Sequence, residues 1–539
     1  MRLDELWIEE FKNLRDLYID FDETSPYTVL VGQNGSGKSN LIEALASIFR
    51  NLDLDEMAPF GYKLQYKCRG NVLRAEASKG QYPAFKVREE KQEAFADLPR
   101  SQFMKVDDQD RPLYRPAFVF GYYSGPTDRL AALFEKHTER FYRLIIKEKG
   151  WREAKKKGVS SNALRRLFYA KTLHGQFALL AFFMEPETSA DDDRDFLRKH
   201  LLIDGLDAVM FALRQPPWAS KKGDPRFWNA EGEVRDFLTH LYPSAITPMR
   251  MPRRIPADLA KNPSVESLYL FLPKASALEH VYATHYRNQF AFFTALESTH
   301  ISKLLAEVRT RVRIKSAEGE RAITYRDLSE GEQQLLLVLG LLKFTAEQET
   351  LFLLDEPDTH LNPAWSVQYL EFLDRFVANR ESCHIVMATH DPLVFAGLCK
   401  EQVRIMRRGK DGWAEAVVPD NHPKGMGVQA ILTSDLFSLR STLDPDTQKD
   451  IDAQRRLSQK DGPLTREEQV ELAQLNERLR PLGFSKTTRD PLYQLFVNAW
   501  TARENLEWSK VTDLTPEQRR ARAKLAADIV DEIVAERGK

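Results

Sequence analysis

A glycine-rich segment near the start of the chain has the residue types that bind a nucleotide phosphate. Residues 32–39 read GQNGSGKS, which fits G-x-x-x-x-G-K-[ST] at every position. Glycines let the backbone wrap around a phosphate with its N–H groups pointing inwards. The charge of Lys38 suits the β- and γ-phosphates, and the hydroxyl of Ser39 suits Mg²⁺. We therefore expect an ATP and Mg²⁺ site at the P-loop residues Gly32, Gln33, Asn34, Gly35, Ser36, Gly37, Lys38, Ser39 and Asn40.

The residues on either side place this segment between a strand and a helix. Residues 27–31 (YTVLV) are a compact β-branched run, typical of a buried strand. Residues 39–45 have apolar side chains at helical spacing. A strand, a glycine-rich turn and a helix are the context that the phosphate-binding motif requires, so a chance glycine loop is the weaker interpretation.

A second segment supplies paired carboxylates at the end of an apolar run. The run LFLL at residues 351–354 leads to Asp355 and Glu356. Asp355 is placed to hold the Mg²⁺ ion, and Glu356 is placed to orient or deprotonate the attacking water. An apolar strand that ends in Asp-Glu is a weak signal alone, so this prediction depends on the other motifs.

Residues 328–334 read LSEGEQQ, which resembles the signature motif of the ABC family of ATPases. The segments GQNGSGKSN, LLDEPDTHLNP and MATHDP resemble that family's Walker A motif, its Walker B motif with D-loop, and its switch histidine. All four occur in the family's order, and the resemblance covers residues 1–60 and 320–395. It implies that Ser329 and Gly331 contact the γ-phosphate bound to a second subunit.

The same resemblance implies roles for further residues of these segments. Glu356 and His390 would be catalytic, with His390 sensing the γ-phosphate, while Ser39 and Asp355 would bind the metal. Residues 358–362 would cross a dimer interface. Two plainer interpretations stay open: Ser329 as a helix N-cap followed by acidic first-turn residues, and His390 as a structural histidine.

One position departs from the family pattern. ABC proteins carry a glutamine at the end of a strand between the two Walker motifs, but residues 119–125 (VFGYYSG) contain none. Either one of Tyr122, Tyr123 and Ser124 takes that place, or the alignment there is shifted. Near the N-terminus, Asn13 and Arg15 resemble a pair that lies near the nucleotide in SMC-type ATPases.

The periodicity along the chain predicts an α/β fold. We expect an ABC-type P-loop NTPase head, a mixed sheet with flanking helices, split by a large helical insertion and followed by a helical C-terminal region. Apolar residues recur at helical spacing in five segments of the insertion, residues 129–146, 163–184, 194–213, 232–242 and 278–308. The expected divisions are the N-terminal lobe, the insertion, the C-terminal lobe and a partner-docking region, at residues 1–127, 128–318, 319–420 and 421–539.

Strands are expected in both lobes of the head. They are two N-terminal strands within residues 3–11 and 17–21, the apolar runs at 350–354 and 384–389, and a terminal pair at 403–406 and 414–418. The chain shows no internal repeat and no long heptad pattern, which departs from the arms of true SMC proteins.

Composition limits the other function classes. A chain of 539 residues should hold more than one domain. Its net charge of −1 gives no global argument for nucleic-acid binding, although the basic segments 147–158 and 250–254 could touch phosphates. The competing interpretation of both segments is a solvated surface.

The cellular setting follows from what the sequence lacks. It has no apolar run of about 18 residues, and its first residues are acidic where a signal peptide is basic, so we expect a cytoplasmic protein without membrane contact. Its three cysteines are scattered, which indicates reduced thiols and no metal motif.

The branch of the family is indicated by resemblance. The long insertion and the lack of a membrane-coupling signal resemble soluble overcoming-lysogenization-defect-like and SMC-like ATPases, which recur in DNA repair and antiphage defence. A built-in Toprim nuclease is not expected, because Asp444-Pro445-Asp446 follows no apolar strand and is interpreted as a turn. Residues 120–125, 431–437 and 489–493 resemble Septu-type defence ATPases, which also accompany some retrons.

That resemblance implies several partners. They are a second copy of the chain in a head-to-tail dimer or higher oligomer, a separate HNH-type nuclease, and DNA or a retron RNA–DNA. The C-terminal helices could instead be a generic docking or oligomerisation surface. The competing hypotheses are an SMC-like repair or recombination ATPase that clamps DNA directly, and an autonomous nuclease.

Overall fold

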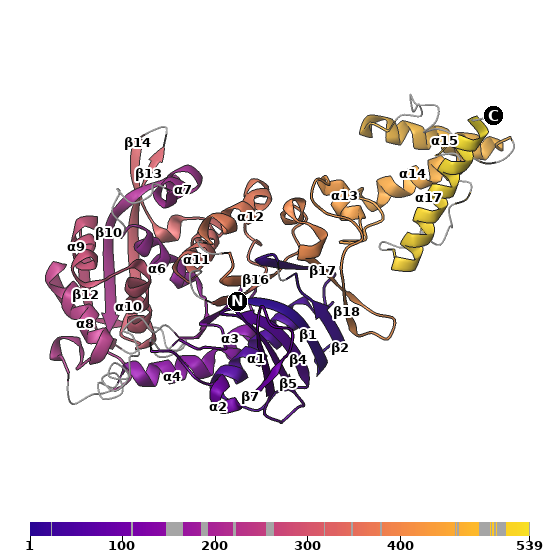
Figure 1. Cartoon of the computed structure of the whole chain (residues 1–539). Helices are drawn as coiled ribbons and strands as arrows, with labels where there is room; N and C mark the ends of the chain where they lie inside the picture. The colour runs from indigo at the N-terminus through magenta and orange to yellow at the C-terminus, as the bar shows by residue number, and fades with distance from the viewer. Residues whose placement is uncertain are drawn as a thin grey trace. The chain divides into compact units, whose positions relative to one another are not determined.

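The protein forms two compact units, Met1–Val418 and Pro419–Lys539. The structure is a computed structural model (Figure 1). It describes residues 1–22, 24–108, 111–146, 165–184, 192–218, 223–254, 264–316, 319–345, 349–377, 380–458, 460, 463–484, 496, 499–500, 503 and 514–537. The basic segment 147–158 and the segment 489–493 therefore lie outside the described residues.

A seven-stranded sheet in the first unit contains the strands that precede the predicted motifs. Its order is β18-β17-β3-β16-β15-β8-β9, and all neighbours run parallel except β17 and β18. The strand bounds are β3 Tyr27–Val31, β8 Phe118–Tyr123, β9 Leu167–Tyr169, β15 Thr350–Asp355, β16 Cys383–Ala388, β17 Val403–Arg408 and β18 Ala414–Val417. Strands β3, β15 and β16 are buried along their whole length, as expected of parallel strands covered on both faces. The strands expected from the sequence in this sheet are confirmed.

The amino-terminal residues form a second, antiparallel sheet of six strands, ordered β2-β1-β4-β5-β6-β7. Its bounds are β1 Arg2–Phe11, β2 Leu14–Asp20, β4 Tyr62–Cys68, β5 Asn71–Ala77, β6 Ala84–Glu89 and β7 Ala96–Leu98. Alternate residues of β4 are buried, so one face of the sheet joins the core and the other faces outwards. The predicted pair of N-terminal strands is confirmed as β1 and β2.

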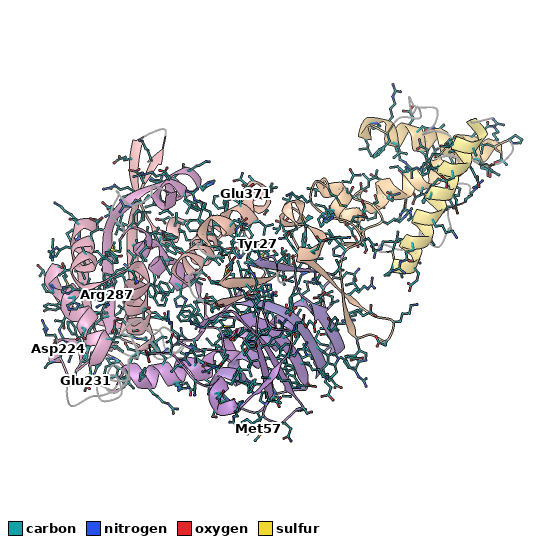
Figure 2. All side chains as sticks on the ribbon, viewed as in Figure 1. Tyr27, Met57, Asp224, Glu231, Arg287 and Glu371 are labelled. Carbon is teal, nitrogen blue, oxygen red and sulfur yellow. The ribbon has the colours of Figure 1, made fainter. Side chains whose placement is uncertain are left out.

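Helix α1 (Lys38–Leu54) follows the P-loop and connects β3 of the parallel sheet to β4 of the antiparallel sheet. In the core it packs between the two sheets. Its apolar residues share one hydrophobic cluster with both sheets. Other helices of the head cover the parallel sheet, and their side chains fill the space between the elements (Figure 2). Tyr27, labelled there, is the first residue of β3. Its hydroxyl donates a hydrogen bond to Asp374 of helix α12 (Pro363–Phe376). The remaining head helices are α2 Arg100–Phe103, α3 Arg129–Leu133, α4 Glu135–Ile145, α6 Thr172–Phe182, α11 Glu330–Thr345 and α12 Pro363–Phe376.

The described part of the insertion has strands as well as helices, and this corrects the prediction of a helical insertion. It contains a five-stranded antiparallel sheet, ordered β11-β12-β10-β13-β14. Its strands are β10 Ile203–Arg214, β11 Ile246–Arg254, β12 Ser264–Leu272, β13 Leu305–Ser316 and β14 Gly319–Thr324. Residues 203–213 and 305–308, expected to be helical, are strands, because an apolar run without clear alternation fits a buried strand as well as a helix.

Helices do cover one face of this sheet (Figure 1). They are α7 Asp192–Leu201, α8 Gly232–Leu241, α9 Ala275–His285 and α10 Gln289–Ile301. Helices α6, α9 and α10 contact its strands, and α8 packs on α9 and α10. The predicted helices at residues 129–146 and 232–242 are confirmed.

The second unit is helical where the structure describes it. Its helices are α13 Val428–Thr433, α14 Pro445–Ser458, α15 Arg466–Leu479 and α17 Pro516–Arg537. Asp444 does not sit in an isolated turn: its carboxylate accepts hydrogen bonds from the backbone N–H groups of Asp446 and Thr447 and so caps α14. An Asp-x-Asp pair at a helix start does not resemble a strand-borne nuclease site.

Two absences complete the description. None of the helices in the described part of the chain combines the length and the apolar character needed to cross a membrane. Cys68, Cys383 and Cys399 form no disulfide in the described structure, and Cys68 and Cys383 are buried.

Candidate nucleotide site

Four parallel strands end at the same level and bring the motifs together. Leu30 of β3 pairs with Ala388 of β16, Ala388 pairs with Asp355 of β15, and Asp355 pairs with Tyr123 of β8. The P-loop, the predicted switch histidine His390 and the predicted catalytic residue Glu356 follow these strands directly in sequence. Because the carboxyl ends of parallel strands share one edge, segments more than 300 residues apart in sequence converge there.

The P-loop has the backbone conformation that only glycine adopts without strain. Gly35 and Gly37 have φ angles of 76° and 110°. At Gly32 an added Cβ would lie 1.9 Å from the carbonyl oxygen of Met406, so no side chain fits. The Nζ of Lys38 donates to the carbonyls of Gly32 and Gln33 at 2.6 and 3.2 Å.

The P-loop also contains a polar atom that the chain leaves unsatisfied. The hydroxyl of Ser36 is buried, and within the described structure it has no hydrogen-bond partner. A buried hydroxyl of this kind costs free energy unless a ligand completes it. Burial lowers the pKa of Lys38 to about 8, although Asp355 and Glu356 oppose the shift. A phosphate would supply both the acceptor for Ser36 and the counter-charge for Lys38, so these residues fit the triphosphate of ATP.

Ser39 and Asp355, the two predicted metal ligands, lie within hydrogen-bond reach of each other. Burial raises the pKa of Asp355 to about 6, and the hydrogen bond from Ser39 opposes that rise. Both residues line one small recess with Glu43, Tyr123 and Arg129. A hydroxyl beside a carboxylate is a donor set that suits Mg²⁺, which prefers oxygen ligands and keeps several waters.

Glu356 is held in an unusual backbone conformation. Its φ is 53°, in the left-handed region that costs a non-glycine residue about 1–2 kcal/mol. Its N–H donates to Ala388 at 2.8 Å, and its carbonyl accepts from the hydroxyl of Thr359 at 2.9 Å and from the amide of Gln334 at 3.3 Å. These contacts hold the strained residue in place.

The switch histidine meets that carboxylate. His390 Nε2 lies 3.5 Å from Oε1 of Glu356, and about a third of each side chain is exposed. Burial and the nearby charge of Lys38 lower the pKa of His390, and Glu356 opposes this. A neutral imidazole beside a carboxylate can orient a water or a phosphate oxygen, which is the arrangement that the motif predicts.

Ser329 caps helix α11 in this chain. Its N–H and hydroxyl donate to the carboxylate of Glu332 at 2.7 and 2.8 Å, and the N–H of Glu332 donates back to its hydroxyl at 3.3 Å. The N-cap interpretation is therefore realised. Ser329 is exposed, while an added Cβ at Gly331 would lie 2.4 Å from the carbonyl of His360. The signature thus packs on its own D-loop and presents Ser329 outwards.

The D-loop is held by polar contacts on both sides. Asp358 is buried and accepts a hydrogen bond from Thr389, and burial raises its pKa to about 6. At the other end, the side chain of Asn362 caps α12 by accepting from the N–H of Trp365 at 3.0 Å. In this chain these two residues shape the loop, and their position across a dimer interface stays a prediction.

The position without the family glutamine is filled by polar residues. Ser124 follows β8, its N–H donates to the carbonyl of Asp355 at 3.3 Å, and its hydroxyl lies 3.0 Å from that of Thr359. Among the described hydrogen bonds of the three candidates, that of Ser124 reaches the D-loop, and Tyr122 bonds Gln334. Tyr122 is largely buried, and Tyr123 lines the recess beside Asp355.

The N-terminal pair is divided by the structure. Asn13 donates to the carbonyl of Gly35 at 3.1 Å and accepts from the amide of Asn40 at 2.6 Å, so it braces the P-loop. Arg15 instead lies over the ring of Trp413, 5.2 Å from its centroid. Only Asn13 of the pair contacts the P-loop among the described contacts.

Three residues of the site were given no role of their own in the sequence analysis, although Gln334 and Thr359 lie inside the signature and D-loop segments. Arg408, at the end of β17, lies within 3.3 Å of the carbonyl of Gly35 through its Nε. Gln334 and Thr359 both bond the backbone of Glu356. Arg408 could not be found from spacing, because β17 joins β3 only in the folded sheet. Gln334 lies inside the signature motif, which was the available signal.

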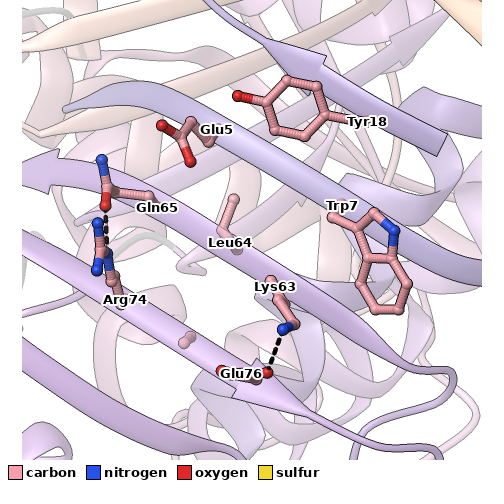
Figure 3. A pocket seen from close by; sticks show the side chains of 9 residues that line it. Glu5, Trp7, Tyr18, Lys63, Leu64, Gln65, Arg74 and Glu76 are labelled. Atoms are coloured by element: carbon pink, nitrogen blue, oxygen red, sulfur yellow. Dashed lines mark hydrogen bonds and ion pairs between the residues drawn. The ribbon is translucent and has the colours of Figure 1, made fainter. Parts of the chain in front are cut away.

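A separate hollow of about 510 Å³ lies on the outer face of the antiparallel sheet (Figure 3). Trp7, Tyr18 and Lys63 line it, with Lys63 paired to Glu76 at 2.8 Å and Arg74 bonded to Gln65. Two of its polar pairs lie within the lining, and the lining contains no cysteine, serine or histidine. The chemistry therefore belongs to the sheet edge, not to this hollow.

The motifs and the strand order establish the fold as an α/β, ABC-type P-loop head, as predicted. Comparison with known proteins agrees. Residues 122–396 match the family described as "AAA domain, putative AbiEii toxin, Type IV TA system", and residues 1–110 match the family described as "AAA ATPase domain".

One curated relative and two solved structures were also found. The chain is 28% identical over 162 residues to the Septu protein PtuA of Bacillus mycoides (strain KBAB4), which is 28% of this chain and 22% of that protein. The match thus spans about a fifth of the relative's length. An Smc head bound to the C-terminal winged-helix domain of ScpA is 13% identical, with a TM-score of 0.33, over 77% of this chain and 98% of that one. An Smc head with an extended coiled coil, bound to the C-terminal domain of ScpA from Pyrococcus furiosus, is 12% identical, with a TM-score of 0.31, over 77% and 96%. Scores this low do not establish a shared fold, which here rests on the strand order and the motifs.

Proposed function

The chain belongs to the family described as "AAA domain, putative AbiEii toxin, Type IV TA system", and we propose that it is the ATPase subunit of a prokaryotic antiphage defence complex. In this proposal it dimerises around ATP and controls an associated HNH-type nuclease. The observation that carries the ATPase part is the convergence of Lys38, Ser39, Asp355, Glu356 and His390 at one sheet edge. The defence part is supported by the similarity to the Septu protein PtuA.

The residues of the edge divide the work of hydrolysis. The P-loop backbone and Lys38 hold the β- and γ-phosphates, and Ser39 and Asp355 hold Mg²⁺, which would neutralise charge that develops on the phosphates. Glu356 orients the attacking water and accepts its proton. His390, 3.5 Å from Glu356, fixes the carboxylate and contacts the γ-phosphate. Release of Lys38 from the carbonyls of Gly32 and Gln33 accompanies binding.

The proposed dimer follows from the exposure of the signature. Ser329 stands at the N-terminal end of a 16-residue helix, where N–H groups and the helix dipole favour an anion. Within the described structure its contacts are with Glu332 and its own helix, not with its own P-loop. A second copy packed head to tail would bring this end to the other chain's γ-phosphate and give a closed two-fold dimer.

Reconstitution tests the proposal. An HNH-type nuclease is sought among the genes beside that of the chain, and the two proteins are purified and combined with ATP, Mg²⁺ and plasmid DNA. We expect ATP hydrolysis by this chain, and DNA cleavage that depends on the nuclease and changes with the nucleotide state. The Lys38→Ala variant should lose ATP binding and nucleotide control. ATP affinity of Lys38→Ala within a few-fold of the unaltered chain would reject the P-loop assignment, and cleavage by this chain alone would favour an autonomous nuclease.

A further inference from the structure

A row of four cations runs along strand β13 in the insertion. Arg309, Arg311, Arg313 and Lys315 are exposed at every second position, and the intervening Thr310 and Val312 are buried. Side chains of a strand alternate between its two faces, so the four cations share the face away from the core. We call these four residues the basic row.

The opposite face of the sheet is the one covered by helices. Helices α6 and α10 contact β13, and α9 contacts β10 and β12. The buried alternate residues of β13 and the buried leucines of β12 lie on that side. The basic row therefore faces outwards from the insertion, in a part of the molecule that the nucleotide site does not use.

The carboxylates near the row are outnumbered by arginines. Glu307 alone is contacted by three arginines, at 2.8 to 3.2 Å: Arg253, Arg309 and Arg326. Asp207 pairs with Arg311 at 3.4 Å, and Glu320 lies directly across from Lys315 on β14. The six cations of this face thus surround three carboxylates, which leaves a net charge of about +3 on a chain whose total charge is −1.

The basic segment 250–254 does not supply this surface alone. Arg250 pairs with Glu266 at 3.0 Å and lies 5.1 Å from the ring centroid of Trp228, so its charge is matched locally. Arg253 reaches Glu307, where it adds to the positive side of the row. The period-two alternation of residues 308–315 (VRTRVRIK) is the stronger signal for phosphate contacts.

We propose that the basic row binds the phosphate backbone of a nucleic-acid duplex. From Arg309 to Lys315 the strand rises about 20 Å, which matches about six phosphates along one strand of a duplex. Cations at regular spacing along one strand suit a regular array of phosphates. Surfaces that bind single strands interleave cations with aromatic rings, and the basic row contains none. A duplex is therefore favoured over a single strand.

The same outer face has an apolar end that we exclude from this site. Met249 and Met251 of β11 and Phe271 of β12 are exposed, and they lie on the far side of β10 from the row. These residues offer no group that bonds a phosphate. A protein partner on this end is an alternative occupant of the face, and it would not depend on the row.

The test measures salt-dependent binding of a fluorescein-labelled DNA duplex of about 20 bp, two helical turns. Fluorescence anisotropy is recorded with the full chain without nucleotide, from low to high salt. Four phosphate contacts predict that log Kobs falls against log[salt] with a slope of about −3.6, or about a hundredfold between 50 and 200 mM. The variant R309Q/R311Q/R313Q/K315Q should lose most of this slope, and the single variants R313Q and K315Q about 0.9 each.

A charge-matched control separates the row from total charge. The variant K79Q/K86Q/K91Q/K105Q removes four exposed lysines of the first lobe and should keep the slope. The thermal midpoint and ATP hydrolysis of each variant report on folding, since the row is outside the nucleotide site. The proposal is overturned if the unaltered chain binds no duplex, if the row variants keep the full slope, or if the control loses as much. Single-stranded DNA bound as tightly, with the same loss in the row variants, would overturn the choice of a duplex.

Discussion

The side-chain amide of Gln334 donates a hydrogen bond to the backbone carbonyl of Glu356 across 3.3 Å. Gln334 lies in the first two turns of the signature helix α11, and Glu356 follows the Walker B strand. The same side chain accepts from the N–H of His360 at 3.3 Å, and only 4% of it is exposed. One buried amide therefore joins the signature helix, the D-loop and the backbone of the catalytic carboxylate within a single chain.

Replacing this amide should slow hydrolysis more than it weakens binding. In Gln334→Leu the N–H of His360 loses its partner and Glu356 loses one of two bonds to its carbonyl, each at a cost of about 0.5–1.5 kcal/mol. The strained φ of Glu356 is then less well held, and we expect kcat to fall about tenfold or more. Steady-state ATPase assays and ATP titrations measure the two effects.

Gln333→Leu is the matched control, because among the described hydrogen bonds its side chain donates to the carbonyl of Leu328, at 2.8 Å and just before its own helix. Its kcat should stay within about threefold of the unaltered chain. Equal losses in both variants would mean that the helix, and not the amide bridge, carries the effect.

Removing the charge of the catalytic carboxylate should trap the bound state. Glu356→Gln keeps the size of the side chain but cannot accept a proton, so hydrolysis should fall about 10²–10⁴-fold while ATP binding persists. An ATP-bound dimer should then accumulate, measured by light scattering after size-exclusion chromatography. Hydrolysis at the unaltered rate would show that Glu356 is not the base, and a monomer with ATP bound would count against the proposed dimer.

A buried histidine of the insertion should make the protein less stable in acid. Burial lowers the pKa of His300 to about 4, with the charges of His174 and Lys303 adding to the effect and Glu297 opposing it. The folded protein holds this ring neutral, whereas the unfolded chain protonates it near pH 6.5. Stability contributed by the neutral ring is therefore full above pH 6.5 and is lost as the pH falls towards 4, by about 2 kcal/mol between pH 7 and 5.

The variant His300→Phe keeps the aromatic contacts with His174 and Phe177 and removes the titration. Urea unfolding gives the free energy of unfolding at pH 7 and at pH 5. From pH 7 to pH 5 this free energy should fall by about 2 kcal/mol less in His300→Phe than in the unaltered chain. His280→Phe, at an exposed position of α9, is the control and should leave the difference unchanged. Parallel pH dependence in all three proteins would exclude His300 as the source.

The sequence predicted the nucleotide edge because each part of it is local. A run such as residues 350–354 is apolar throughout and ends at its carboxylates, and the P-loop requires its glycines by conformation. What joins these parts is the register of four strands, which parallel pairing imposes. The role of Arg408 could not be predicted from the sequence, because its contact with Gly35 joins residues more than 370 positions apart and depends on the strand pairing.

The insertion was predicted less well because its periodicity is ambiguous. Strand β10 is apolar at positions that fit a helix face as well as a strand, and its two partners come from distant segments, residues 264–272 and 305–316. Strand β11 has almost no buried residue, so no pattern marks it. Long-range pairing decided these segments, and local preference did not.

Ser329 should complete the nucleotide site of a second chain and not that of its own chain. Ser329 is exposed and is bonded to Glu332 of its own helix, so a change there should not disturb its own P-loop. Lys38→Ala removes the phosphate charge, and Ser329→Arg blocks the helix N-terminus that a partner's phosphate would approach. Each variant alone should be nearly inactive, because every site in either homodimer has one defect.

Mixing the two variants distinguishes a trans site from a cis site. If Ser329 acts on the partner's nucleotide, a mixed dimer has one site with both defects and one with neither. With free subunit exchange half of the dimers are mixed, so about a quarter of the unaltered ATPase activity should return. If Ser329 acted within its own chain, every site would keep one defect and no activity would return.

Exchange is verified separately with two affinity tags. No recovery despite exchange would count against independent trans sites, although strict coupling of the two sites would give the same result. Comparing ATP occupancy of the mixed dimer with that of each homodimer separates these two outcomes, since coupling blocks turnover and leaves binding at the intact site.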